Sequence, residues 1–369
     1  MRTQFSSYTF RNGVTIKNRI IMAPMTISSS LPNGDVSDDE LSYYARRAKS
    51  GIGTIITGCA AVNSLSHGFT DSIGVDCDER IPSLTKLASA IKDNGATAIL
   101  QIYHAGRMTN SKLLNGETPV SASNIAALRP NAEVPRPLSN EEILQTIQHF
   151  ADATKRAIAA GFDGVEIHGA NTYLVQQFFS PHSNRRNDEW GGDVIARMKF
   201  PLAVVKAVTD AARDAGRPFI TGYRFSPEER EEPGITMDDT KKFVTALAAT
   251  ALDYLHVSIN QFKAGSMRDA EDTASRIELI QQTVGDQITV IGVGGLLTPL
   301  QVEDALKIVP LVSLGHAIVM DPDWYKKALD NADDSIYPAL YRSKQHELDI
   351  PEPLWNMLTN IPGWFRVED

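Results

Sequence analysis

The chain has 369 residues, 42% of them hydrophobic and 22% charged, which is typical of a globular protein with a large core and not of a disordered chain. Its 36 basic and 45 acidic residues give a net charge of −9, which disfavours nucleic-acid and anionic-membrane binding and favours a small-molecule substrate. Two cysteines are too few for a disulfide framework, an iron–sulfur cluster or a structural zinc site.

The amino-terminal region has no apolar signal segment, and no later stretch reaches about 18 consecutive apolar residues. We therefore expect a cytoplasmic protein without a membrane span. The segment YTFRNGVTI places Asn12 and Gly13 between two β-prone arms, which predicts a β-hairpin. We expect this hairpin to cover one end of the fold that follows.

One unit recurs between residues 20 and 320: a helical stretch, a short break often containing Gly or Pro, and an apolar β-rich run. Ser139 with Glu142, Thr236, and Thr298 with Pro299 mark helix starts. The predicted strands lie in NRIIMAPM, KSGIGTIITG, KDNGATAILQIYH, AAGFDGVEIHG, DAGRPFITGYRF, ATALDYLHVSI, VGDQITVIGVGG and KIVPLVSLGHA.

Strands that alternate with helices pair in parallel through right-handed crossovers, and eight such units predict an α/β fold, a (β/α)₈ TIM barrel. A doubly wound sheet is the alternative. No segment has the composition of a linker, so we expect residues 1–369 to form a single domain. Residues 105–138 form a long polar connection after the third strand, and connections of this length are usually functional.

In a TIM barrel the active site lies at the carboxyl ends of the strands. The residues at these ends are mostly polar and nearly free of carboxylates, which disfavours two-carboxylate glycosidase chemistry and a metal site. They are Pro24, Met25, Thr26, Gly58, Cys59, Gln101, His104, His168, Asn171, Tyr173, Arg224, Gly294, Gly295, Gly315 and His316.

The stretch HGANTY, residues 168–173, has two interpretations. If the chain turns helical after the strand, His168 and Asn171 lie on one side and could both donate to one oxygen, with the Tyr173 phenol as a general acid. Alternatively, Asn171 or Thr172 caps the helix YLVQQFF, Tyr173 packs, and His168 is a core residue. The spacing alone leaves both open.

Two other features point to a bound anion. Gly294, Gly295 and Gly315 follow the last two strands, where barrels commonly bind phosphate through backbone N–H groups. Arg224 ends the strand ITGYRF and would place a fixed positive charge inward, suited to a reduced anionic flavin. Ordinary turn glycines and a surface arginine are the alternatives.

These pieces occur together in a recognisable order: NRIIMAPMT, QIYHAGR, GFDGVEIHGANTYLVQQFFSPHSNRRNDEWGG, YRFSPEE, GVGG and LGHAIVMDPDW. In them the chain resembles the Old Yellow Enzyme family of NAD(P)H-dependent flavin oxidoreductases. The resemblance implies FMN at the barrel mouth with its phosphate on the glycine loops, and NADH or NADPH as the hydride donor.

The resemblance also implies residue roles. Thr26 would contact the flavin N5 and O4 side, Gln101 the pyrimidine edge and Arg224 the N1 and O2 side. His168 and Asn171 would hold the carbonyl or nitro oxygen of the substrate, and Tyr173 would supply the proton. The full set of expected cofactor contacts is Pro24, Met25, Thr26, Cys59, Gln101, His168, Arg224, Gly294, Gly295, Gly315 and His316.

The implied activity is hydride transfer through FMN to an activated alkene, a nitro compound or a quinone. Within the family, oxidative demethylation of a small N-methylated compound is the alternative. From other classes, the alternatives are a flavin-free barrel aldolase or isomerase and a non-catalytic flavin-binding protein. A homo-oligomer is left open.

The chain departs from the family pattern in places. His316 stands where many members have an arginine, so a bidentate guanidinium grip on phosphate is missing. Thr26 stands where one branch has a cysteine. Two cysteines and the remaining length leave no place for the iron–sulfur cluster and nucleotide domain of larger relatives, so we expect neither. We expect the tail SPHSNRRNDEWGG to be structural, with Arg185 or Arg186 pairing with Asp188 or Glu189.

Overall fold

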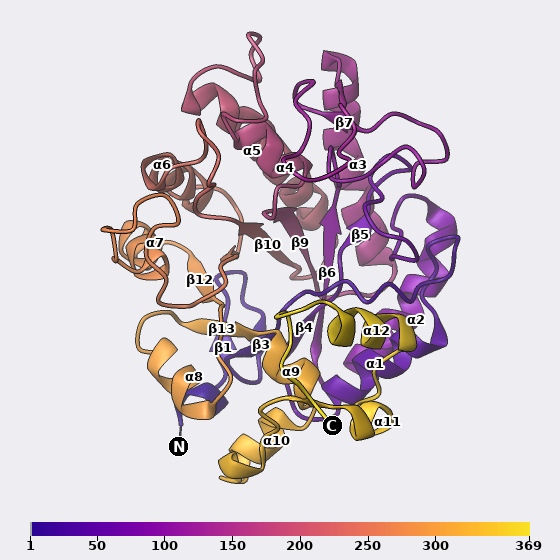
Figure 1. Cartoon of the computed structure of the whole chain (residues 1–369), viewed down its shortest axis with the longest axis vertical. Helices are drawn as coiled ribbons and strands as arrows, with labels where there is room; N and C mark the ends of the chain where they lie inside the picture. The colour runs from indigo at the N-terminus through magenta and orange to yellow at the C-terminus, as the bar shows by residue number, and fades with distance from the viewer. Residues whose placement is uncertain (1) are drawn as a thin grey trace.

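The computed structural model describes residues 2–369, and its centre is a closed barrel of eight parallel strands (Figure 1). The ring closes because β4 pairs with both β3 and β6, and β13 pairs with β3. The predicted TIM barrel is confirmed, and the doubly wound alternative is wrong. The barrel strands are β3 (Ile20–Met22), β4 (Thr54–Ile56), β6 (Thr97–Tyr103), β9 (Gly164–Gly169), β10 (Ile220–Phe225), β11 (Tyr254–Val257), β12 (Thr289–Gly292) and β13 (Leu311–Leu314).

Helices surround the barrel, as Figure 1 shows. Ser139, Thr236 and Thr298 begin three of them, as predicted. Each forms a capping box, in which its hydroxyl accepts from the backbone N–H three residues later and the side chain of that later residue accepts from its own N–H. The helices after successive strands are α1 (Asp38–Ala48), α2 (Ile81–Lys92), α3 (Asn140–Ala159), α5 (Val194–Arg213), α6 (Met237–Ala248), α7 (Arg276–Val284), α8 (Pro299–Ala305), α9 (His316–Met320) and α10 (Trp324–Leu329).

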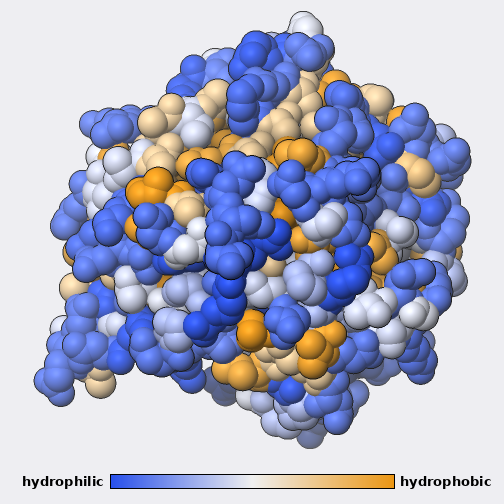
Figure 2. Space-filling view, turned by 90° about the horizontal axis from the view of Figure 1, so that it is seen from above, coloured by the Kyte–Doolittle hydropathy of each residue, from blue (hydrophilic) through white to orange (hydrophobic). Residues whose placement is uncertain are grey.

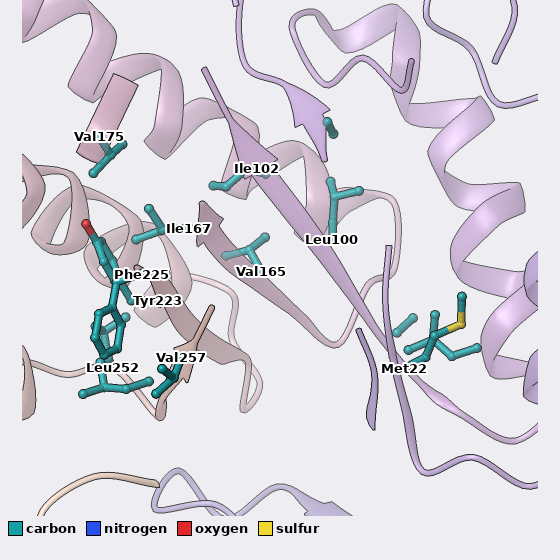
Figure 3. Packing of buried hydrophobic residues seen from close by; sticks show 14 of the residues in the cluster. Met22, Leu100, Ile102, Val165, Ile167, Val175, Tyr223, Phe225, Leu252 and Val257 are labelled. Carbon is teal, nitrogen blue, oxygen red and sulfur yellow. The ribbon is translucent and has the colours of Figure 1, made fainter. Parts of the chain in front are cut away.

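Side chains alternate between the two faces of each barrel strand, and the outward face holds most of the core. Leu100 and Ile102 of β6, with Val165 and Ile167 of β9, belong to the cluster of buried apolar side chains drawn in Figure 3. A second, smaller apolar cluster fills the amino-terminal end of the barrel with Ile21, Ile56, Ile99, Ile220, Tyr254, Ile291 and Leu311.

The predicted hairpin is present as β1 (Tyr8–Thr9) and β2 (Thr15–Ile16), paired in antiparallel register. Phe10 and Ile16 belong to the cluster inside the amino-terminal end of the barrel. The hairpin therefore closes this end, as expected, and leaves the carboxyl ends of the strands for a site.

The tail after α4 (Leu174–Phe179) is structural, as predicted. Arg186 pairs with Asp188, the Nε to Oδ1 distance being 3.0 Å, and its Nη1 donates to the carbonyls of Ala122 and Leu138 at 3.0 and 2.7 Å. The tail thereby fastens the long connection of residues 105–138 to the segment that precedes α5.

The remaining elements are short. The long connection contains β7 (Val120–Ser121), paired with β8 (Arg136–Pro137). Leu340, Leu348, Leu354 and Leu358 of the carboxyl-terminal segment join the main core. The other short elements are β5 (Ala60–Ala61), β14 (Leu340–Tyr341), β15 (Val367–Glu368), α11 (Gln345–Leu348), α12 (Glu352–Asn360) and the 3₁₀ turns η1 (Thr3–Phe5), η2 (Asp78–Arg80), η3 (Asp333–Ser335) and η4 (Arg342–Lys344).

The face of the molecule in Figure 2 is mainly hydrophilic, with small separate hydrophobic patches. None of the helices within residues 2–369 combines the length and the apolar character that a membrane crossing requires.

Candidate active site

The inward face of the barrel changes from apolar to polar towards the carboxyl ends of the strands. On β6, Ile99 belongs to the apolar cluster, and Gln101, two residues later, is buried and polar. Ile220 and Arg224 on β10 repeat this change. The alternation of a strand therefore directs polar groups into the mouth of the barrel.

A cavity of about 430 Å³ opens at this mouth, within the size range of small-molecule sites. Seven predicted site residues line it: Pro24, Met25, Arg224, Gly294, Gly295, Gly315 and His316. Thr26, Cys59, Gln101, His168 and Tyr173 do not line it, and Asn171 lines a neighbouring cavity of about 670 Å³. Ile259, Asn260 and Gln261 line both cavities.

Gly294 and Gly295 allow the close approach of two loops at this cavity. Their φ angles are +124° and +63°, in the region that favours glycine. A Cβ on Gly294 would lie 2.7 Å from the backbone nitrogen of Phe262, which donates to the Gly294 carbonyl at 2.9 Å. The cavity wall at Gly294 is therefore backbone, which suits a phosphate cradle.

Arg224 is a buried cation at the cavity wall, as the sequence predicts. Its Nη2 donates to the Ser258 hydroxyl at 3.2 Å, and its buried Nε has no partner within residues 2–369. Burial lowers the pKa of the Arg224 guanidinium, and the nearby buried carboxylate of Glu166 partly offsets this effect. An unpaired buried donor is costly unless a ligand accepts from it, so Arg224 fits an electron-rich ligand edge.

His168 is the penultimate residue of β9 and is buried. Burial, together with the charge of Arg224, lowers its pKa to about 3, so the imidazole is neutral. The N–H of Ala170 donates to its Nδ1 at 3.3 Å, which leaves the proton on Nε2. His168 can therefore donate one hydrogen bond through Nε2.

Asn171 is not helical. The first interpretation of HGANTY, which placed His168 and Asn171 on one side of a helix, is therefore wrong about the backbone. It has a φ of +55° in a turn between β9 and α4, and α4 begins only at Leu174. The alternative was also wrong about the cap: Tyr173 is the N-cap residue, without a side-chain bond, and neither Asn171 nor Thr172 caps the helix. The left-handed turn is compatible with Asn171 because its short polar side chain tolerates this region.

The turn nevertheless fixes the Asn171 amide. Its Oδ1 accepts from the Ser258 hydroxyl at 3.0 Å, and the same hydroxyl accepts from Arg224. The Asn171 N–H donates to Ser226 at 3.0 Å. These hydrogen bonds leave the Nδ2 donors of Asn171 available to a ligand.

Tyr173 packs against three rings. Its centroid lies 4.8 Å from that of His168, 5.3 Å from Tyr103 and 6.4 Å from Phe69. Burial raises the pKa of its hydroxyl well above the usual value, and nearby Cys59 acts in the same sense. The phenol is therefore protonated at any physiological pH, and no group within residues 2–369 forms a hydrogen bond with it.

Three further residues predicted to contact the cofactor, Thr26, Cys59 and Gln101, interact with other side chains of the protein. Thr26 Oγ1 lies 3.4 Å from Cys59 Sγ, and burial raises the pKa of this thiol to about 11. Gln101 Nε2 donates to Glu166 Oε1 at 2.7 Å. Glu166 is a carboxylate that the strand-end residues do not include, so the barrel interior is less free of carboxylates than the sequence suggests.

His316 begins α9, and its ring centroid lies 4.2 Å from that of Phe365, with the two rings tilted by 35°. Burial lowers its pKa, so it carries no charge at neutral pH and does not replace the missing arginine. Gly363 and Trp364 also line the cavity, and the sequence pattern gave no reason to expect this carboxyl-terminal segment there.

Several polar residues of the barrel interior were missed. Glu166 in GVEIHG, His256 in YLHVS and Ser313 in LVSLG each interrupt an apolar strand, and all three are buried and hydrogen-bonded. Glu166 stands two residues before His168, so the two-residue period of a strand places both on the inward face. That period was the signal that could have found them.

Comparison with known proteins identifies the family. The model of the NADH:flavin oxidoreductase / NADH oxidase family matches residues 4–335. The chain is 46% identical over 354 residues to the NADH:acrylate oxidoreductase of Vibrio harveyi, covering 95% of this chain and 35% of that protein. It is 45% identical over 354 residues to the NADH:fumarate oxidoreductase of Klebsiella pneumoniae (strain 342), covering 94% and 38%. The chain thus spans little more than a third of these two relatives.

A relative of similar length is the "Probable NADH-dependent flavin oxidoreductase YqiG" of Bacillus subtilis (strain 168), 40% identical over 370 residues, with 99% of this chain and 98% of that protein covered. Among solved structures, morphinone reductase matches with a TM-score of 0.77 and 25% identity over 89% of this chain and 90% of that one. The Old Yellow Enzyme homologue of Zymomonas mobilis has the same fold, with a TM-score of 0.79 and 24% identity over 89% and 93%. The resemblance to Old Yellow Enzyme is thus confirmed, and the chain belongs to the NADH:flavin oxidoreductase / NADH oxidase family.

Proposed function

We propose that this chain is an FMN-dependent oxidoreductase that takes hydride from NADH or NADPH and passes it to an activated alkene, a nitro compound or a quinone. The observation that carries the proposal is the buried Arg224, whose Nε has no protein partner within residues 2–369 and which lines one cavity together with Gly294, Gly295 and Gly315. When bound, FMN supplies the hydride acceptor and donor that the side chains lack.

Arg224 would hold the N1 and O2 side of the flavin. Its guanidinium remains charged at all relevant pH values, and negative charge on a nearby ring is stabilised strongly where water is excluded. The glycine loops would hold the phosphate through backbone N–H groups, with Pro24, Met25 and His316 as further walls. Thr26, Cys59 and Gln101 would lie along the rest of the ring.

His168 and Asn171 would bind the oxygen of the acceptor. His168 offers the Nε2 proton, because Ala170 occupies Nδ1, and Asn171 offers its amide donors, because Ser258 occupies Oδ1. Two preoriented donors stabilise the negative charge that develops on a carbonyl or nitro oxygen during hydride transfer. Tyr173 would then deliver its proton to the substrate carbon.

An electron-poor alkene is the acceptor class to test first. Two relatives are named for acrylate and fumarate, which are alkenes activated by a carboxylate, although this chain covers only 35% and 38% of them. Morphinone reductase has been solved with tetrahydroNAD, which supports a nicotinamide donor for this fold. We further propose that residues 1–369 form a single domain.

The experiment separates the two halves of the reaction. Protein reconstituted with FMN is reduced anaerobically with NADH and then mixed with cyclohexenone or acrylate, while flavin absorbance is followed. Loss and return of the oxidised absorbance support the proposal, and an Arg224→Met variant should bind FMN about 10- to 100-fold more weakly. Reduction without reoxidation by any alkene, nitro compound or quinone would indicate a flavin-binding or demethylase role instead.

A further inference from the structure

Three buried side chains form a hydrogen-bonded chain that runs across the barrel to the cavity. Glu166 Oε2 lies 2.9 Å from His256 Nδ1, and His256 Nε2 lies 2.7 Å from Ser313 Oγ. The three residues come from β9, β11 and β13 and are at most 1% exposed. Of the three, only Ser313 lines the cavity.

The Glu166 end of this chain is an acceptor. Its Oε1 accepts from the Gln101 amide at 2.7 Å, and its Oε2 accepts from the Tyr254 hydroxyl at 3.0 Å. Burial alone would raise the pKa of Glu166, but the hydrogen bonds from His256 and Gln101 and the charge of Arg224 outweigh burial and lower it. Glu166 is therefore an anion, and His256 donates to it through Nδ1–H.

Gly222 is part of this arrangement because it lets the Tyr254 ring reach Glu166. A Cβ on Gly222 would lie 2.0 Å from the Tyr254 ring, so any other residue would displace the phenol. The contact between Tyr254 and Glu166 is thus built into three adjacent strands, which pair in register at Glu166, Gly222 and Tyr254.

The His256 end then fixes the direction of the next bond. Burial lowers the pKa of His256, and a neutral imidazole that donates through Nδ1 has a bare Nε2. Ser313 must therefore donate its single hydroxyl proton to His256 Nε2. What Ser313 presents to the cavity is lone pairs only, so it can accept a hydrogen bond there and cannot donate one.

We propose that Ser313 accepts a hydrogen bond from a ribityl hydroxyl of FMN, with Glu166 and His256 as positioning residues that fix its polarity. The inference rests on the proposed function. Ser313 stands two residues before Gly315, on the phosphate side, while His256 pairs in register with Arg224, on the ring side. The ribityl polyol joins the flavin ring to the phosphate. Its hydroxyls are therefore the donors that Ser313, placed between the two, would contact.

The tautomer of His256 tests whether Ser313 is the donor in its hydrogen bond with His256. Nitrogen NMR of histidine-labelled protein, with the His256 signals assigned by their loss in His256→Asn, should show a protonated Nδ1 and a bare Nε2. A protonated Nε2, alone or in an imidazolium, would make Ser313 an acceptor from His256 and would overturn the inference.

The ligand contact is tested by the affinities of FMN and of lumiflavin, which has the ring without the polyol. Ser313→Ala should weaken FMN binding about 3- to 10-fold in a fluorescence titration and leave lumiflavin binding unchanged. Thr289→Val is the matched control, since it removes a barrel-strand hydroxyl that bonds Tyr8 at 2.8 Å in the hairpin-covered end. This control should leave both affinities unchanged.

The outcomes are distinct. If wild-type protein binds FMN and Ser313→Ala binds it equally well, or loses lumiflavin to the same extent, the polyol contact is refuted and the proposed function stands. If wild-type protein binds no FMN, the proposed function fails, and the role of Ser313 fails with it.

Discussion

Replacement of Tyr173 with phenylalanine should separate the two half-reactions. The hydroxyl has no protein partner within residues 2–369, and the ring contacts with His168, Tyr103 and Phe69 remain in the variant. We therefore expect the free energy of unfolding to change by less than about 0.5 kcal/mol. The loss of a positioned general acid should slow alkene reduction by about 10²- to 10⁴-fold.

Stopped-flow absorbance measures the two steps separately, with NADH for flavin reduction and cyclohexenone for reoxidation. Tyr223→Phe is the matched control, because the buried Tyr223 hydroxyl also has no partner and its ring packs outside the barrel against Phe243. Tyr173→Phe should be reduced at the wild-type rate and reoxidised slowly, and Tyr223→Phe should match wild type in both steps. An equal loss in both steps of Tyr173→Phe would refute the proton-donor role.

Three further predictions concern the site and the scaffold. His168→Ala should weaken the binding of phenols, which place an oxygen anion at the proposed donors, by about tenfold or more in a spectral titration, and an unchanged affinity would contradict that role. Gly294→Ala should lower the free energy of unfolding by at least about 2 kcal/mol, because φ is +124° and the new Cβ would overlap the backbone of Phe262. Gly285→Ala, with a φ of +55° and no atom near the new Cβ, should lower it by about 1 kcal/mol. Equal losses of the two variants in chemical denaturation would contradict this account. Burial raises the pKa of Glu40 from 4.5 to about 7, so between these values the unfolded carboxyl is ionised while the folded one keeps its proton. About 3 kcal/mol of stability is then present below pH 4.5 and lost as the pH rises through 7, and Glu40→Gln should remove this dependence in denaturation curves; a variant with the same pH profile as wild type would disprove it.

The sequence predicted the barrel well because each unit repeats a strong local signal. Capping residues such as Ser139, Thr236 and Thr298 fix helix starts through bonds within four residues, and apolar runs fix the strands. Closure of the ring by β13 with β3 follows from eight such units, so no long-range information was needed.

The site was predicted less completely because it depends on contacts between strands. The left-handed turn at Asn171 is stabilised by Ser226 and Ser258, which lie far along the chain, so residue spacing could not show that the helix begins only after this turn. The partners of Glu166 come from β6 and β11, and no local pattern reveals them. Trp364 lines the cavity, although no helix or strand was predicted for its segment.

The central claim is that the cavity between Arg224 and the glycine loops binds FMN. A titration of the purified chain with FMN, followed by visible absorbance and by quenching of flavin fluorescence, tests it most directly. We predict a yellow complex with a single FMN per chain, and an Arg224→Met variant that binds it much more weakly. A colourless protein that takes up no FMN, or binding that does not respond to Arg224, would contradict the account.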